Sequence, residues 1–299
     1  MQKLKETERC RIVANKQLNS SVFALEIYSK RLSQTIVPGQ FVMIRCGEGI
    51  DAYLRRPLSV CSADLAKNTL TILYQVKGVG TNMLSRYRAD QLLDVLGPLG
   101  NGFQLERLNE NENMRKENER KENRSRPRVA ILGGGIGVFP VYFLAQTIQT
   151  AQLADIDIYL GFRDKESVLL AEEFEKYAAS FSLMTEDGTA GGKGFVTEPF
   201  RNYCEIAHKK ESAYQTVFAC GPEPMLKSIQ NICKTYELNG QISLEQRMGC
   251  GIGACLVCAC AIKTKGDSAG QGESNEQVDF LYKHVCKDGP VFQMSEVIF

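Results

Sequence analysis

Four cysteines near the C-terminus have the spacing of metal ligands. Cys250, Cys255, Cys258 and Cys286 follow the pattern C-x4-C-x2-C-x27-C, which is typical of the thiolates that hold a plant-type [2Fe–2S] cluster. Structural zinc usually has two separated pairs of ligands, whereas three of these thiols lie within nine residues. Small residues at 249–255 allow backbone N–H groups to turn toward the sulfurs. The spacing therefore predicts a site that carries one electron at a time.

A fifth cysteine, Cys260, competes for the fourth ligand position. Residues 256–262 are mostly apolar and predict a buried strand, on which alternate side chains share a face. Cys258 and Cys260 would then point the same way, roughly 7 Å apart. Periodicity does not choose between Cys260 and Cys286. An alternative of another class is a nucleotide-binding scaffold that zinc stabilises and that has no redox role.

Composition limits the function classes. The chain has 299 residues, 43% of them hydrophobic, which is enough for two compact domains and a small third one. Its net charge of +1 indicates neither nucleic acid nor an anionic membrane as a partner. No apolar run reaches the length of a membrane span, and the charged N-terminus lacks the core of a signal peptide. Eleven cysteines, an odd number, then predict a reducing cytoplasm.

Hydrophobic patterning predicts a multi-domain chain that combines β and α/β units. Residues 1–105 alternate β-like runs with turns and predict a small antiparallel β-barrel. Residues 106–127 are almost all Asn, Glu, Lys and Arg, and predict a polar insertion. Residues 128–240 alternate strands with helices, which predicts a doubly wound parallel sheet. The cysteine motif defines a third unit at 241–299.

Shorter elements are expected within these units. In the barrel they are strands at 21–27, 40–45, 58–62 and 69–76, a helix at 81–87 and a closing glycine-rich turn at 96–103. In the parallel-sheet unit they are strands at 128–132, 155–162, 181–185 and 215–220 and helices at 138–150, 169–179 and 223–236. A polar loop is expected at 265–277.

Two glycine turns in the parallel-sheet unit could approach a phosphate. Residues 133–137 join a strand to a helix, where backbone N–H groups and the helix N-terminus favour an anion. The second turn, at 220–222, ends a late strand at the edge where open α/β sheets bind ligands. In the barrel, Arg56 could pair with a phosphate and Ser59 could hydrogen-bond a flavin.

These motifs together resemble the ferredoxin reductase superfamily. In that superfamily a flavin barrel with RxxS precedes a nicotinamide domain with GGGxG and CGPxxM, and a cluster domain can follow. More narrowly, residues 245–255 and 285–292 resemble the electron-transfer subunits of NAD-dependent dihydroorotate dehydrogenases of type B. The resemblance covers nearly the whole chain. The polar insertion and the loop before Cys286 are longer than that family leads us to expect.

The resemblance implies a set of cofactor contacts and makes Cys286 the fourth cluster ligand. The residues it places at FAD are Arg56, Pro57, Leu58, Ser59, Leu73, Tyr74, Gln75, Gly80 and Thr81. Those it places at NAD are Gly134, Gly135, Gly137, Cys220, Gly221 and Pro222.

The resemblance also implies a function. A separate catalytic subunit with FMN would oxidise dihydroorotate, in an assembly of two copies of each subunit. Electrons would then reach NAD⁺ through the [2Fe–2S] cluster and FAD, as a step of pyrimidine (UMP) biosynthesis. No acid–base catalyst is expected in this chain, and neither of its two histidines lies in a catalytic motif. The alternative is an NAD(P)H-dependent flavin and iron–sulfur reductase subunit that serves ferredoxin or hydrogenase partners.

The choice between NAD and NADP depends on two residues after the second strand. Arg163 could meet a 2′-phosphate, but the carboxylate of Asp164 beside it would oppose one. This pair, with the family resemblance, favours NAD.

Overall fold

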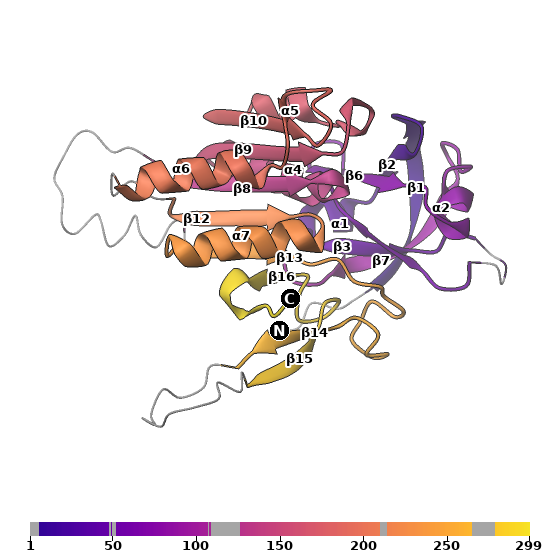
Figure 1. Ribbon diagram of the computed structural model, residues 1–299. Helices are drawn as coiled ribbons and strands as arrows, with labels where there is room; N and C mark the ends of the chain where they lie inside the picture. Colours follow the sequence, from indigo (N-terminus) through magenta and orange to yellow (C-terminus); the bar gives the residue numbers. More distant parts are fainter. Residues whose placement is uncertain are drawn as a thin grey trace.

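The computed structural model describes residues 6–47, 49, 52–106, 108, 126–209, 214–264 and 279–299. The predicted polar loop at 265–277 and most of the insertion at 106–127 lie outside these residues. Within them, two seven-stranded sheets lie side by side, and a small C-terminal unit, yellow in Figure 1, packs against both.

The N-terminal sheet is antiparallel, with the order β4-β3-β7-β1-β2-β6-β5. Strand β4 at one end also packs against β6 near the other, so the sheet curls into the predicted barrel. Helix α1 (Lys30–Thr35) begins at Ser29, whose side chain accepts a hydrogen bond from the backbone of Leu32. The other elements are β1 (Glu6–Gln17), β2 (Val22–Tyr28), β3 (Phe41–Ile44), β4 (Arg56–Ser59), β5 (Ser62–Asp64), β6 (Thr69–Gln75), α2 (Val79–Leu84) and β7 (Leu92–Leu99).

Two of these strands are absent from the sequence prediction. Strand β1 buries Cys10 and Ile12 and leaves charged neighbours in solvent. Because one face of the strand is solvated, its sequence has few apolar residues and the alternation of apolar and polar residues was not recognised. Strand β7 contains residues 96–99, the first half of the predicted glycine-rich turn at 96–103. Gly97 there serves close packing instead, because an added Cβ would lie 2.8 Å from Val42. The strand predicted at 58–62 is wrong as a single element, since β4 ends and β5 begins inside it.

The second sheet has the order β11-β10-β9-β8-β12-β13-β16 and is parallel except where β13 meets β16. Alternate residues of β8 enter two separate cores. Val129 and Ile131 pack with α4 and α5 on one face, and Ala130 and Leu132 pack with α6 and α7 on the other. The predicted doubly wound sheet is therefore confirmed. Its elements are β8 (Arg128–Gly134), α4 (Val138–Thr150), β9 (Asp155–Phe162), α5 (Ala171–Glu175), β10 (Ser180–Thr185), β11 (Gly192–Lys193), α6 (Thr197–Lys209), β12 (Thr216–Cys220), α7 (Glu223–Thr235), β13 (Gly240–Ser243) and β16 (Val291–Gln293).

Helix α5 is shorter than the predicted helix at 169–179. Leu170, just before it, has a positive φ of 62°, which a continuous right-handed helix cannot contain. The domain boundary at residue 240 stays a prediction, and it falls at the start of β13, a strand of the parallel sheet.

The C-terminal unit contains the antiparallel pair β14 (Ala259–Lys263) and β15 (Phe280–His284). The buried strand predicted at 256–262 is wrong at its start. Leu256 has a φ of 61°, and its side chain and that of Val257 are 61% and 59% exposed. These residues form a turn beside the cysteine sulfurs instead of pairing with a neighbouring strand. No helix in the described part of the chain is long and apolar enough to span a membrane.

A buried polar cluster joins the first two strands of the parallel sheet. The carboxylate of Asp157, 1% exposed, accepts two hydrogen bonds of 2.8 Å from Arg128 and one of 2.7 Å from the Tyr214 hydroxyl. The Tyr159 hydroxyl lies 2.7 Å from that of Tyr214. Burial, followed by the neighbouring Tyr159 and Asp157, raises the pKa of Tyr214 far above its usual value.

We expect Asp157→Ala to lower the free energy of unfolding by about 3 kcal/mol, because it leaves Arg128 and Tyr214 without their buried acceptor. Urea unfolding would measure the change. Asp155→Ala is the matched control, since Asp155 lies on the same strand but is exposed. Equal losses in the two variants would contradict this role for the cluster.

Candidate functional site

Cys250 and Cys255 form one pair of thiols at the surface of the C-terminal unit. The backbone N–H groups of Ile252, Ala254 and Cys255 donate to the Cys250 sulfur at 3.4, 3.2 and 3.4 Å. The N–H of Cys250 donates to the Cys255 sulfur at 3.4 Å. Burial opposes ionisation of Cys250, but these backbone hydrogen bonds outweigh it and lower its pKa to about 6. The loop thus favours a thiolate.

Cys258 and Cys286 form a second, buried pair, with 2% and 1% of their surfaces exposed. The N–H of Cys286 donates to the Cys258 sulfur at 3.4 Å, and the N–H of Gly253 donates to the Cys286 sulfur at 3.1 Å. Burial, with a hydrogen bond to Cys258, raises the pKa of Cys286 to about 12. Gly253 links the two pairs, since its loop also carries Cys250 and Cys255.

These two pairs suit a [2Fe–2S] cluster, in which each iron takes two protein ligands. Within the described residues, no group of three or more His, Cys, Asp or Glu side chains is arranged to hold one metal ion. Gly251 and Gly253 have φ values of +74° and +84°, which glycine adopts without strain. Their conformation lets the loop direct several N–H groups at the sulfurs, as cluster thiolates require.

Cys260 lies apart from this arrangement. It is on β14, paired with Lys283 of β15, and burial together with the nearby Cys258 raises its pKa to about 11. In the described part of this unit, the backbone N–H groups that donate to a cysteine sulfur donate to Cys250, Cys255, Cys258 and Cys286, and none of these hydrogen bonds goes to Cys260. The geometry therefore favours Cys286 over Cys260 as the fourth ligand.

A cleft of about 260 Å³ lies between the barrel and the parallel sheet. It brings together six of the nine residues predicted at FAD, and Cys220 from the second glycine turn. Its far wall is apolar and comes from the start of α4, and Met248 from the cysteine loop completes it. A flat apolar ring with a polar edge, such as the predicted flavin, fits such a lining, and we call this space the flavin cleft. The six predicted residues are Pro57, Leu58, Ser59, Leu73, Tyr74 and Gln75.

The other three predicted FAD residues lie together next to this cleft. An added Cβ on Gly80 would lie 2.7 Å from the Arg56 Nε, so the guanidinium rests against the start of α2. The Thr81 hydroxyl accepts hydrogen bonds from the N–H groups of Lys77 and Gly78, at 3.0 and 3.3 Å. A cation beside a compact backbone turn suits a pyrophosphate.

The two predicted glycine turns touch each other. An added Cβ on Gly137 would lie 2.5 Å from the carbonyl oxygen of Cys220 and 2.6 Å from the nitrogen of Gly221. A pocket of about 440 Å³ extends from these turns to Gln75 and Glu245 at the rim of the flavin cleft. The turns thus lie where a ligand at the sheet edge would meet the flavin.

A further pocket of about 550 Å³ continues from the glycine turns across the end of β9. Phe195, 61% exposed, offers a ring face there, and Glu186 and Arg163 are also in the lining. Arg163 donates to Asp164 at 2.8 Å. Hydrogen bonds from Ser167 and Arg163 lower the pKa of Asp164 to about 2. The carboxylate is therefore ionised and forms an ion pair with Arg163.

Glu245 is a site residue that the sequence reasoning missed. It directly follows β13, at the carboxyl edge of the sheet, and lines both the flavin cleft and the adjoining pocket beside Lys77. Burial of its carboxyl group raises the pKa of Glu245, and the nearby Lys77 lowers it in part, although the residue as a whole is exposed. Its place at the end of a strand was the signal available in the sequence.

Comparison with known proteins agrees with this geometry. Residues 131–231 match an oxidoreductase NAD-binding domain, and residues 245–298 match the iron–sulfur cluster binding domain of dihydroorotate dehydrogenase B. A Geobacillus sp. (strain WCH70) protein is 34% identical over 97% of this chain and 98% of its own length. A Bacillus mycoides (strain KBAB4) protein is 37% identical over 96% of both chains. Both are named dihydroorotate dehydrogenase B (NAD(+)), electron transfer subunit.

The chain belongs to this family of electron transfer subunits. The family match confirms the predicted oxidoreductase class and the predicted cofactors FAD, [2Fe–2S] and NAD. It also decides against the zinc scaffold, since the matched C-terminal domain binds an iron–sulfur cluster. An electron transfer subunit requires a catalytic partner subunit.

Solved structures confirm the fold. An NADH-dependent reduced ferredoxin–NADP oxidoreductase, described for flavin-based electron bifurcation, superposes with a TM-score of 0.72 at 26% identity, over 99% of this chain and 91% of that one. A ferredoxin NADP⁺ reductase from Neisseria gonorrhoeae reaches a TM-score of 0.59 at 17% identity, over 78% of this chain and 92% of its own. The second likeness concerns the fold alone.

Proposed function

We propose that this chain carries electrons to NAD⁺. The electrons come from a separate catalytic subunit that oxidises dihydroorotate. One observation carries the proposal: the flavin cleft is bounded on one side by the glycine turns and on another by Met248, two residues before the first cluster cysteine, Cys250. When bound, a [2Fe–2S] cluster exchanges single electrons, and FAD accepts them singly and releases a hydride. The chain supplies position rather than acid–base chemistry.

The residues of the chain divide this task. We assign Arg56, Gly80 and Thr81 to the flavin pyrophosphate, and we assign to the flavin ring the six predicted residues that line the cleft. Cys250, Cys255, Cys258 and Cys286 would hold the cluster. Gly251 supports this placement, because its loop packs directly on Met43 of the barrel, where an added Cβ would lie 2.6 Å from the Met43 side chain.

For NAD we assign the two glycine turns and the pocket beyond them. Backbone N–H groups at Gly134, Gly135 and Gly137 would meet the pyrophosphate, and Phe195 the adenine. The second turn, Cys220, Gly221 and Pro222, would border the nicotinamide where the pocket opens on the flavin cleft.

The partner in this proposal is an FMN-containing catalytic subunit, in an assembly of two copies of each. An exposed apolar surface around Cys255 supports a docking role, since isolated chains rarely expose such clusters. Ile252, Leu256 and Val257 there are 42%, 61% and 59% exposed. None of the eleven cysteines forms a disulfide, which supports a location in the reducing cytoplasm.

Co-expression with a candidate FMN-containing subunit tests the proposal. We expect a stable complex, of a mass that corresponds to two copies of each chain, which reduces NAD⁺ with dihydroorotate. Failure of this coupling in a complex that contains both flavins and the cluster would overturn it. Transfer to ferredoxin instead would favour the alternative, a reductase subunit related to the ferredoxin–NADP oxidoreductase.

A substitution at Asp164 tests the preference for NAD⁺. In Asp164→Asn the carboxylate that holds Arg163 is lost, and the guanidinium can meet a 2′-phosphate. We expect the ratio of kcat/KM for NADH to that for NADPH to fall about tenfold, which is the value of one charged hydrogen bond. Glu166→Gln is the control, since Glu166 lies in the same loop. An unchanged ratio in Asp164→Asn would refute the role of this pair.

A further inference from the structure

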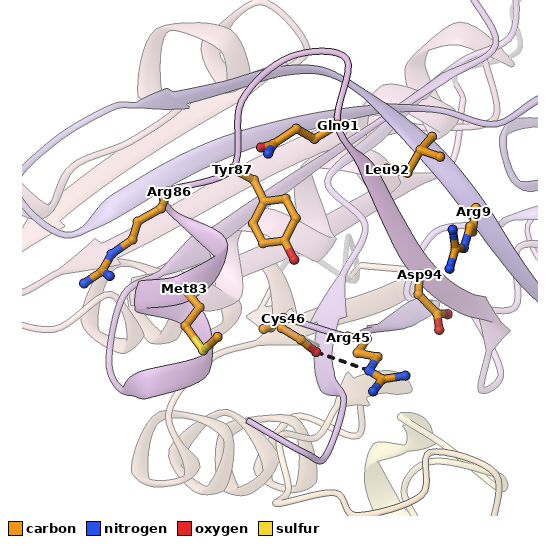
Figure 2. Close-up of a pocket in the computed structure, with 10 residues that line it drawn as sticks. Arg9, Arg45, Cys46, Met83, Arg86, Tyr87, Gln91, Leu92 and Asp94 are labelled. Atoms are coloured by element: carbon orange, nitrogen blue, oxygen red, sulfur yellow. Dashed lines mark hydrogen bonds between the residues drawn. The ribbon is translucent and has the colours of Figure 1, made fainter. Parts of the chain in front are cut away.

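A separate cavity lies at one end of the barrel. It has a volume of about 810 Å³ and is bordered by the paired strands β1 and β7, the residues that follow β3, the end of α2 and the segment after α2 (Figure 2). Among the described residues, its lining has no member in common with the flavin cleft or the two NAD pockets. The function proposed above therefore leaves this cavity unused.

The lining of the cavity is strongly basic. Arg9, Arg45 and Arg86 contribute three guanidinium groups, and Asp94 is the one carboxylate among the described lining residues. Asp94 is already neutralised, because Arg55 donates to both of its oxygens at 2.6 and 2.8 Å. An excess of positive charge therefore faces the cavity and favours an anionic ligand.

The arginines occupy two sides of the cavity. Figure 2 shows Arg9 and Arg45 near Asp94 on one side, and Arg86 beyond Met83 on the other. Arg45 Nε donates to the carbonyl oxygen of Gly47 at 3.2 Å, and Arg86 donates to Asn82 at 2.8 Å. The first bond uses the Nε of Arg45 and leaves its two terminal nitrogens for phosphate oxygens, whereas the second uses a terminal nitrogen of Arg86, whose guanidinium is directed away from Tyr87 in Figure 2.

Between the two basic sides the cavity has an apolar and aromatic surface. The ring of Tyr87 lies across the middle of the view in Figure 2, and Met83, lower in the view, also lines the cavity. Cys46, on the floor, is fully buried. An aromatic ring and a thioether in the same lining suit a flat heterocycle rather than a simple inorganic anion.

From this juxtaposition we infer that the cavity binds a free nucleotide. Its phosphates would lie against Arg9 and Arg45, and its base against Tyr87 and Met83, with Arg86 at the outer edge. The concave shape and the volume match a small ligand. A nucleic acid would need a wider basic surface, and the chain as a whole carries a net charge of only +1.

Calorimetry on the full chain, loaded with FAD and cluster and saturated with NAD⁺, tests this inference. The probes are CTP, GTP and inorganic triphosphate, none of which carries the adenosine of FAD or NAD. We expect both nucleotides to bind more tightly than inorganic triphosphate, because only they have a base. In Arg9→Gln and Arg45→Gln, affinity should fall about tenfold or more in each case, as expected for a lost charged hydrogen bond.

Arg88→Gln is the matched control, because Arg88 lies one residue from Tyr87 but its guanidinium is directed at the carbonyl groups of Ser85 and Tyr87. It should bind the probes as the unmodified chain does. The inference would be overturned if none of the three probes bound. It would also be overturned if the Arg9→Gln and Arg45→Gln variants bound the nucleotides as tightly as the unmodified chain does. Loss of FAD from those variants would also overturn it and assign the cavity to the cofactor. Loss of binding in the complex with the catalytic subunit would assign it to that partner.

Discussion

Cys286→Ser should yield a chain that keeps FAD but loses the iron–sulfur absorbance. Cys286 lies in the buried pair with Cys258, where a serine hydroxyl is a poor substitute for a thiolate. Loss of an outer hydrogen bond alone costs roughly 10–100-fold in metal affinity, so removal of a ligand should cost more. Reduction of NAD⁺ by dihydroorotate in the complex should fall at least about 100-fold. NADH-dependent reduction of an artificial acceptor at FAD should remain nearly unchanged.

Cys260→Ser provides the control for this prediction. Cys260 is also partly buried and lies two residues from Cys258, but it makes no sulfur contact of the kind seen between the two pairs of thiols in the described residues. Visible absorbance and iron content should equal those of the unmodified chain. If Cys260→Ser loses iron and Cys286→Ser keeps it, the ligand assignment is reversed.

Gly137→Ala should weaken both folding and the binding of NAD⁺. The added methyl group would lie 2.5 Å from a backbone oxygen of the second glycine turn, and backbone cannot move aside as a flexible side chain can. We expect a loss of about 3 kcal/mol in the free energy of unfolding. The two turns must separate, so the affinity for NAD⁺ should fall about tenfold or more. Urea unfolding and NAD⁺ titration measure the two effects.

Gly135→Ala separates close packing from backbone conformation. Gly135 has a φ of +54° with no atom within 4 Å of an added Cβ, whereas Gly137 has an ordinary φ of −64°. Gly135→Ala should therefore cost only the strain of a left-handed residue, about 1 kcal/mol. A larger loss in Gly135→Ala than in Gly137→Ala would show that contact between the turns is unimportant.

The parallel-sheet unit was the most predictable part of the fold. Strand β9 and helix α4 have the predicted bounds, because buried strands and helices carry continuous apolar patterns with clear ends. Strand β1 was missed since half of its residues face solvent. Strand β7 was missed because glycine and proline, which usually mark turns, here allow close packing against β3.

The sequence by itself determined which groups this protein can hold. Cysteine spacing predicted the cluster, and three short motifs predicted the flavin and nicotinamide sites, because ligand types and glycine turns are local properties of the chain. Only the tertiary structure decided how these groups meet. Its hydrogen bonds to cysteine sulfurs favour Cys286 over Cys260 as the fourth ligand. It also joined the two glycine turns and brought Glu245 to the flavin cleft. It also formed the basic cavity from β1, β3 and β7, since contacts between distant strands leave no pattern in a local stretch of sequence.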